Sequence, residues 1–194
     1  MVTRFYIIFL ILLFSNMSFK STIYAKEVAG VELEEVARLS VNNTQLVLNG
    51  SAVRLEAQHA VYVGGLYLKK QSTSLKEIIT DPNPKRFLFY CSTSQISSDT
   101  LISAWEQGFA INYSEQQIEK MKPMINEFNK VWQTGLSEGD EVWVDFIPNE
   151  GTMISINGKL VSKIAGDDFY HAFLKTWLGP HPFSSKMKNA LLGK

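Results

Sequence analysis

The sequence predicts an α+β fold, in which a largely antiparallel β-sheet carries helices packed on one side. Short runs rich in β-branched residues come in blocks, and tight turn signals join them. Stretches with apolar residues at helical spacing are grouped in the same way, without the strict alternation that a parallel sheet requires. The 194 residues are 45% hydrophobic and 20% charged, which is enough chain for one domain with a sizeable core.

The first 25 residues have the pattern of a secretory signal peptide. Arg4 precedes ten unbroken apolar residues, Phe5–Phe14, and Ile23 and Ala25 fit the −3 and −1 positions of a cleavage site after Ala25. An uncleaved membrane anchor is the alternative, but ten apolar residues fall short of the roughly 20 that cross a bilayer. We therefore expect residues 26–194 to form a single domain that is periplasmic or secreted, with no membrane span once the signal is removed.

Charge and cysteine content exclude several classes of protein. Without residues 1–25 the chain loses Arg4 and Lys20, so 17 basic side chains face 19 acidic ones and the net charge is −2. A near-neutral chain without a basic cluster argues against binding to nucleic acid. Cys91 is the only cysteine and lies in an apolar run, so we expect a buried thiol and no internal disulfide.

One stretch, residues 46–70, carries the features on which a functional prediction depends. Asn49-Gly50 is a turn signal, because both residues tolerate positive φ. Val61–Leu68 is uncharged and is expected to form a strand buried on both faces. The pair Gly64-Gly65 inside it indicates a β-bulge, or a place where a ligand or another backbone comes close.

The other elements follow from periodicity, caps and breakers. Further strands are expected over Val36–Leu48 (one or two, with a turn at Asn42-Asn43), Arg86–Cys91, Glu141–Ile147, Thr152–Asn157 and Lys159–Ile164. Helices are expected over Ser74–Thr80, from Ser98 or Asp99, from Ser114, from Asp167 or Asp168, and over Ser184–Leu192. Pro123 should kink the helix that begins at Ser114 or start a new segment, because proline lacks the backbone donor.

Motifs of metal, cofactor or nucleophile chemistry do not occur in the sequence. His59, His171 and His181 form no paired spacing, and no phosphate-binding loop, dinucleotide pattern or nucleophile elbow is present. We therefore expect neither a metal site nor a cofactor. The aromatic residues that repeat at helical spacing, such as Trp105, Phe173 and Trp177, are expected in the core.

Arg54 and Tyr62 are the candidate site residues. A buried arginine without a counter-charge costs several kcal/mol. Arg54 must therefore lie at the surface, pair with a carboxylate such as that of Glu56, or face a pocket that takes an anion. The phenol of a buried Tyr62 likewise needs a polar partner.

Several segments together resemble the chalcone isomerase-like family of exported bacterial proteins. They are GSAVR with VYVGGLYL, then AWEQGF, FNKVW, VDFIPNEGTMISINGK and the closing DDFYHAFLKTWLGPHPFSSKMKNALLG. The resemblance covers nearly all of Val28–Gly193. It implies an open-faced β-sandwich of the chalcone isomerase type, in which a helical layer covers a large antiparallel sheet and a cleft lies between them. Plant relatives divide into isomerases, fatty-acid-binding proteins and non-catalytic helpers.

The resemblance also implies roles for the two candidate residues. Arg54 matches the family arginine that meets the anionic group of the ligand. Tyr62 falls where the isomerases have a catalytic threonine, in their FTAIGVYL segment, and where the fatty-acid binders have tyrosine. The implied function is an exported, non-catalytic binder of a fatty acid or similar amphipathic carboxylate. Two alternatives remain: a chalcone-type isomerase (an intramolecular lyase) and a ligand-free protein-interaction module, which charged residues along the cleft would favour.

The expected partner is thus a small amphipathic ligand bound by a monomer. One geometric condition applies to the site. Eight residues of one extended strand span about 26 Å, so Arg54 and Tyr62 meet only if the chain turns around Ala57–His59. No glycine or proline marks such a turn.

Overall fold

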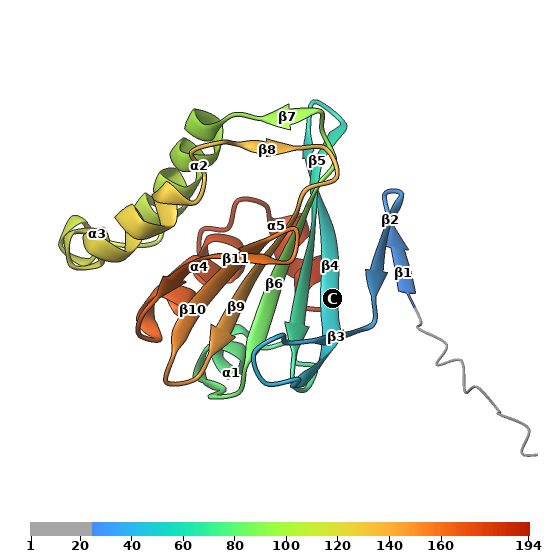
Figure 1. Cartoon of the computed structure of the whole chain (residues 1–194), viewed down its shortest axis with the longest axis horizontal. Helices are drawn as coiled ribbons and strands as arrows, with labels where there is room; N and C mark the ends of the chain where they lie inside the picture. The colour runs from blue at the N-terminus through green and yellow to red at the C-terminus, as the bar shows by residue number, and fades with distance from the viewer. Residues whose placement is uncertain (1–24) are drawn as a thin grey trace, which may run out of the picture.

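The computed structural model describes residues 25–194 and confirms the predicted α+β class. Figure 1 shows one large sheet with the helices gathered on one side of it. The sheet has seven strands in the order β11-β10-β9-β6-β5-β4-β3, and all neighbours pair antiparallel. The predicted signal peptide lies outside the described residues except for Ala25, so it stays a prediction.

The elements follow one another in blocks, as the sequence indicates. The strands are β1 (Ala25–Val28), β2 (Val31–Glu34), β3 (Val36–Arg38), β4 (Gln45–Glu56), β5 (His59–Leu68), β6 (Lys85–Cys91), β7 (Gln95–Ile96), β8 (Leu136–Ser137), β9 (Glu141–Ile147), β10 (Gly151–Ile156) and β11 (Lys159–Ile164). The helices are α1 (Leu75–Thr80), α2 (Ser98–Ala110), α3 (Glu115–Lys130), α4 (Asp168–Leu178) and α5 (Ser185–Leu191). Within the described residues, no helix is long and apolar enough to cross a bilayer.

The main core lies between the sheet and the helices. Each helix contributes buried apolar side chains to it, and β5, β6, β9 and β10 contribute one face each. Side chains along a strand point alternately to the two faces of the sheet, so every second strand residue belongs to this core. Representative members are Leu66, Phe87, Val144, Phe128, Phe173 and Trp177.

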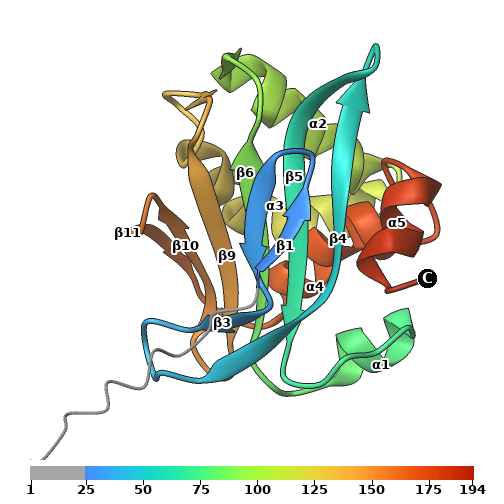
Figure 2. The same ribbon diagram turned by 90° about the vertical axis from the view of Figure 1, so that its right-hand side faces the viewer.

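A second, smaller cluster covers part of the opposite face of the sheet, which we call the outer face. The β1–β2 hairpin packs there, and Figure 2 shows it lying over the sheet on the side away from the helices. Its buried residues Val31 and Leu33 meet Val63, Tyr67 and other outer-face side chains of the sheet. This hairpin was not predicted, because VELE alternates over only four residues next to a polar, exposed first strand.

The helix caps follow the sequence signals closely. Ser114 and Gln117 form the predicted capping box of α3, while Ser97, one residue earlier than expected, caps α2. The expectation of a new segment at Pro123 was wrong, since α3 runs continuously through it. Pro123 lies on the exposed side of the helix, where water can bind the carbonyl that the missing donor leaves free.

The predicted turn at Asn49-Gly50 was also wrong, because β4 runs through both residues with an irregular register after Leu48. The Asn49 amide donates to the carbonyl of Leu191 (2.8 Å) and accepts from the backbone N–H of Ser72 (2.7 Å). A Cβ on Gly50 would lie 2.2 Å from the carbonyl oxygen of Ala190. The pair therefore docks the C-terminal helix against the sheet.

Gly64 and Gly65 pair in regular register, so the predicted bulge is not there. The close approach is made by side chains instead. The Phe87 ring lies 3.3 Å from where a Cβ of Gly64 would be, and Leu33 of the hairpin approaches Gly65 from the other face. Both faces of this strand need the space that a missing side chain leaves.

Gly50→Ala tests the close packing of α5. The new methyl group would meet backbone atoms that cannot move independently, so we expect a loss of about 3 kcal/mol in the free energy of unfolding, measured by urea denaturation. Gly64→Ala is the matched control. Its methyl meets side-chain rings and no backbone atom, Phe87 at 3.3 Å and Tyr62 at 3.8 Å, so a shift of a few tenths of an ångström relieves the contact and we expect a loss of about 1 kcal/mol or less. Equal losses would contradict this account.

Candidate functional site

A tight turn at the tip of β4 and β5 brings Arg54 and Tyr62 together. The two residues are direct cross-strand partners, and Glu56 pairs with His59 across a two-residue loop, Ala57 and Gln58. Both loop residues have positive φ (44° and 69°), the signature of a type I′ hairpin turn. The geometric condition set by the sequence is therefore met without glycine or proline.

Tyr62 points into the layer between the sheet and the helices. Its hydroxyl accepts a hydrogen bond from Nε1 of Trp177 on α4 (3.0 Å), and its ring meets Phe89 edge-on at 5.4 Å between centroids. Burial is the largest influence on the hydroxyl and raises the pKa of Tyr62 to about 12, although Trp177 and Arg54 act in the opposite direction. The phenol is thus protonated at neutral pH and has a hydrogen to donate.

Arg54 lies at the rim of the same face, next to Tyr62. Its side chain is 31% exposed, and Nη2 contacts the carboxylate of Glu56 at 3.4 Å. Glu56 is itself 64% exposed, so this ion pair is long and solvated and holds the guanidinium weakly. Arg54 is therefore neither deeply buried nor locked in a bidentate pair, and its role toward a ligand stays a prediction.

Aromatic side chains fill the space behind Tyr62. Trp177 stacks on Phe87 with ring centroids 4.5 Å apart and meets Trp105 edge-on at 5.2 Å. The indole nitrogens of Trp105 and Trp132 are buried there without a hydrogen-bond partner among the described residues. This layer confirms the predicted aromatic core. The cavities described below lie elsewhere, whereas the resemblance implied a cleft in this layer.

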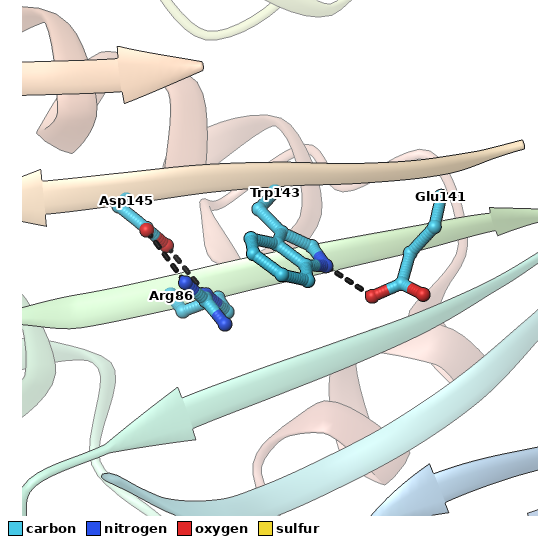
Figure 3. Close-up of polar contacts among 4 residues, drawn as sticks. All are labelled: Arg86, Glu141, Trp143 and Asp145. Carbon is cyan, nitrogen blue, oxygen red and sulfur yellow. Dashed lines mark hydrogen bonds and ion pairs between the residues drawn. The ribbon is translucent and has the colours of Figure 1, made fainter. Parts of the chain in front are cut away.

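A second polar group lies on the outer face, where Figure 3 shows four of its residues. Arg86 is 3% exposed and binds Asp145 through two hydrogen bonds, from Nε (2.7 Å) and Nη2 (2.8 Å). The guanidinium also lies over the Trp143 ring, 4.1 Å from its centroid, and the Trp143 indole donates to Glu141. Antiparallel register produces the group, because Arg86 pairs with Asp145 across β6 and β9.

A cavity with a volume of about 960 Å³ adjoins this group. Its walls are the β1–β2 hairpin and β3 on one side and the outer face of β5, β6 and β9 on the other. A smaller cavity of about 390 Å³ lies between Asn49, the start of α1 and the chain end. The cavity on the outer face and the Arg54–Tyr62 pair therefore lie on opposite faces of the sheet.

Sequence reasoning missed the Arg86–Asp145 pair and the partner of Tyr62. Asp145 offered a signal, since an acidic residue inside the apolar run EVWVDFI needs a counter-charge once buried. Trp177 offered none, because its spacing fits a core residue equally well. Only the docking of α4 on the sheet shows that its indole nitrogen reaches Tyr62.

A large antiparallel sheet with a helical layer on one face and a small hairpin on part of the other defines an open-faced β-sandwich. The profile described as chalcone isomerase-like matches residues 25–193. The chain therefore belongs to the chalcone isomerase-like family, as the sequence motifs indicated.

Comparison with solved structures finds a fatty-acid binding protein from Arabidopsis thaliana with the same fold. The TM-score is 0.63 at 11% sequence identity, over 81% of this chain and 96% of the other. At this identity the likeness establishes the fold alone. Comparison with curated proteins finds no match.

The turn at Ala57 and Gln58 can be improved by substitution. L-residues with a side chain lose about 1 kcal/mol or more at positive φ, whereas Asn and Gly adopt it readily. We expect Ala57→Asn combined with Gln58→Gly to raise the free energy of unfolding by about 1–2 kcal/mol, measured by thermal and urea denaturation. The control Gln58→Ala retains a Cβ and should give no gain; a gain of the same size would contradict the turn assignment.

The Arg86–Asp145 pair can be tested by a double-mutant cycle. Removing one partner leaves an unpaired buried charge, so Arg86→Met or Asp145→Leu alone should cost about 3–5 kcal/mol of stability. The double variant replaces both charges with apolar groups and should recover most of that loss. Additive losses in chemical denaturation would show that the two side chains are not coupled.

Proposed function

We propose that this protein is a non-catalytic binder of a fatty acid or a similar amphipathic carboxylate, with Arg54 and Tyr62 as its head-group site. The observation that carries the proposal is the cross-strand pairing of Arg54 and Tyr62, with the Tyr62 hydroxyl bonded to Trp177. Membership of the chalcone isomerase-like family and the fold shared with a plant fatty-acid binding protein support it. An exported location, from the predicted signal peptide, is part of the proposal.

The head-group chemistry follows from the donors present. A guanidinium can bind a carboxylate through two parallel charge-assisted hydrogen bonds. Arg54 is available for this because its contact with Glu56 is long and solvated. Tyr62 accepts from Trp177 and can donate its own hydrogen, so it offers a third donor at the inner side of the site.

The tail would lie in the layer between the sheet and the helices. Each buried methylene contributes about 0.8 kcal/mol, so a dozen contribute roughly 10 kcal/mol before the costs of association. The aromatic rings near Tyr62 now fill this layer, and α2 and α4 would have to move outward for a tail to enter. Binding would therefore exchange ring–ring contacts for ring–alkyl contacts.

The chemistry of this layer also bears on the two alternatives. Most side chains that form the core between the sheet and the helices are apolar or aromatic. The charged Lys85 of β6 is also buried there beside Phe146, but its ammonium group donates to the backbone carbonyls of Asp81 and Asn83. Charged cleft positions would have favoured a protein-interaction module. A chalcone-type isomerase would need a group that acts on a phenolate and an enone. The Tyr62 phenol, with a pKa of about 12, stays protonated at neutral pH and can donate a hydrogen bond to a carboxylate.

Native mass spectrometry and calorimetry with hexadecanoate test the proposal. We expect the purified protein to bind one acyl chain, and Arg54→Ala to weaken binding about 10–100-fold, since charge-assisted hydrogen bonds contribute roughly 1.5–3 kcal/mol. Tyr62→Phe should cost less because it removes a neutral donor. Arg38→Ala is the matched control, since Arg38 is an exposed arginine on β3 that lines the outer-face cavity.

Two outcomes would contradict the proposal. Equal binding by the wild type, Arg54→Ala and Arg38→Ala would remove Arg54 from the head-group site. A protein that binds no hexadecanoate and instead cyclises a chalcone to a flavanone would establish the isomerase alternative.

A further inference from the structure

The outer-face cavity is lined by polar and aromatic side chains that differ from those around Arg54 and Tyr62. It lies under the β1–β2 hairpin, has a volume of about 960 Å³ and is open to solvent on one side. Arg54 and Tyr62 do not line it, and Figure 2 shows its hairpin wall on the face away from the helices. A ligand in this cavity would therefore be independent of one bound between the sheet and the helices.

The floor of the cavity holds a hydrogen-bond donor that is open to the cavity and has no protein acceptor. Arg86 uses Nε and Nη2 for Asp145, and among the described residues Nη1 has no partner. Figure 3 shows the guanidinium with Asp145 on one side and its remaining nitrogen directed away from that carboxylate. A buried guanidinium that lines a cavity is stabilised when an oxygen atom accepts its free N–H groups.

Aromatic rings form the same floor. Trp143 and Tyr90 are half-buried, and Tyr67 and Leu88 lie beside them on neighbouring strands. The register places Leu88 opposite Trp143 and Tyr90 opposite Glu141, so apolar and polar groups alternate across the sheet. Such a floor offers flat apolar area, one carboxylate acceptor and one guanidinium donor within a few residues.

The charges of the walls exclude an anionic ligand. Four carboxylates line the cavity, those of Glu32, Glu34, Glu35 and Glu141, against the guanidinium groups of Arg38 and Arg86. Asp145 already neutralises Arg86, so the walls carry a surplus of negative charge. The pKa of Tyr67 reflects this, because burial raises it first and the charges of Glu34 and Glu141 raise it further.

A cation is the remaining charged class, and the floor disfavours it. Arg86 already places one positive charge in the floor, and its guanidinium occupies a face of the Trp143 ring that a second cation would use. A neutral ligand with several hydroxyl groups can bind both the guanidinium donor and the carboxylate acceptors. Its oxygens accept from Arg86, its hydroxyl hydrogens donate to Glu141, and its C–H faces pack on Trp143 and Tyr90.

We propose that the outer-face cavity is a second binding site, which takes a neutral polyhydroxylated ring, that is, a carbohydrate. Arg86 and Glu141 bind its hydroxyl groups, and Trp143 and Tyr90 pack against its apolar face. The Arg86–Asp145 pair orients the free guanidinium nitrogen toward the ligand. A cavity of about 960 Å³ has room for one or two sugar rings, and because it is open to solvent we expect weak, rapidly exchanging binding.

Saturation-transfer NMR on the full protein tests the site, with maltose and N,N′-diacetylchitobiose as probes. We expect transfer from protein to at least one disaccharide, with a dissociation constant of about 1 mM or tighter. Glu141→Gln and Trp143→Ala should each weaken binding about tenfold or more. Both residues are only half-buried, so these variants should retain the fold, which the unchanged hexadecanoate affinity would verify.

Glu150→Gln is the matched control, because Glu150 is a carboxylate on the loop after β9 that pairs with Lys163 and lies outside the cavity. It should bind the disaccharide like the wild type. Binding of spermidine in place of the sugars would replace the carbohydrate by a cation and overturn the proposal. Absence of transfer to either disaccharide, or equal binding by Glu141→Gln and Glu150→Gln, would overturn it as well.

Discussion

The stacking of Trp177 on Phe87 joins the helical layer to the sheet, and much of the structure depends on it. One ring belongs to α4 and the other to β6, the central strand of the seven. Trp177 also donates to Tyr62 on the next strand, so a single side chain contacts two strands and fixes the height of α4 above them. Since a buried aromatic pair contributes both area and specific geometry, an outward movement of α4 costs free energy that the contacts of a bound tail would have to offset. The position of the Tyr62 hydroxyl in the candidate head-group site therefore depends on where Trp177 is held.

The two faces of the sheet are covered in different ways. The helix face is covered by aromatic and aliphatic side chains that exclude water. The outer face is only partly covered by a hairpin, and it buries one ion pair beside an open cavity. Alternation along each strand assigns neighbouring residues to opposite environments, so Phe87 lies in the core while Arg86 lies under the hairpin. One strand thus serves two surfaces of contrasting polarity.

Local signals predicted most of the elements, and long-range contacts account for the failures. Ser114 with Gln117 and Asn157-Gly158 fix a helix start and a hairpin through their own backbone chemistry, and both predictions were confirmed. Asn49-Gly50 carries an equally strong turn signal, but its contacts with residues near 190 outweigh it. The turn at Ala57 and Gln58 shows the reverse case, where strand pairing imposes a conformation that the residues do not favour. For the candidate site, the sequence identified Arg54 and Tyr62 but not Trp177 or Arg86, whose roles depend on register and docking.

The hydrogen bond from Asn49 to Leu191 joins residues 142 positions apart and has a consequence for folding kinetics. Contacts between such distant residues form slowly, because the loop they close must lose its freedom first. β4 therefore cannot reach its final environment during synthesis until the segment around residue 191 has emerged. Until then the side-chain amide of Asn49 and the backbone at Gly50 face solvent, so this part of the sheet is completed last.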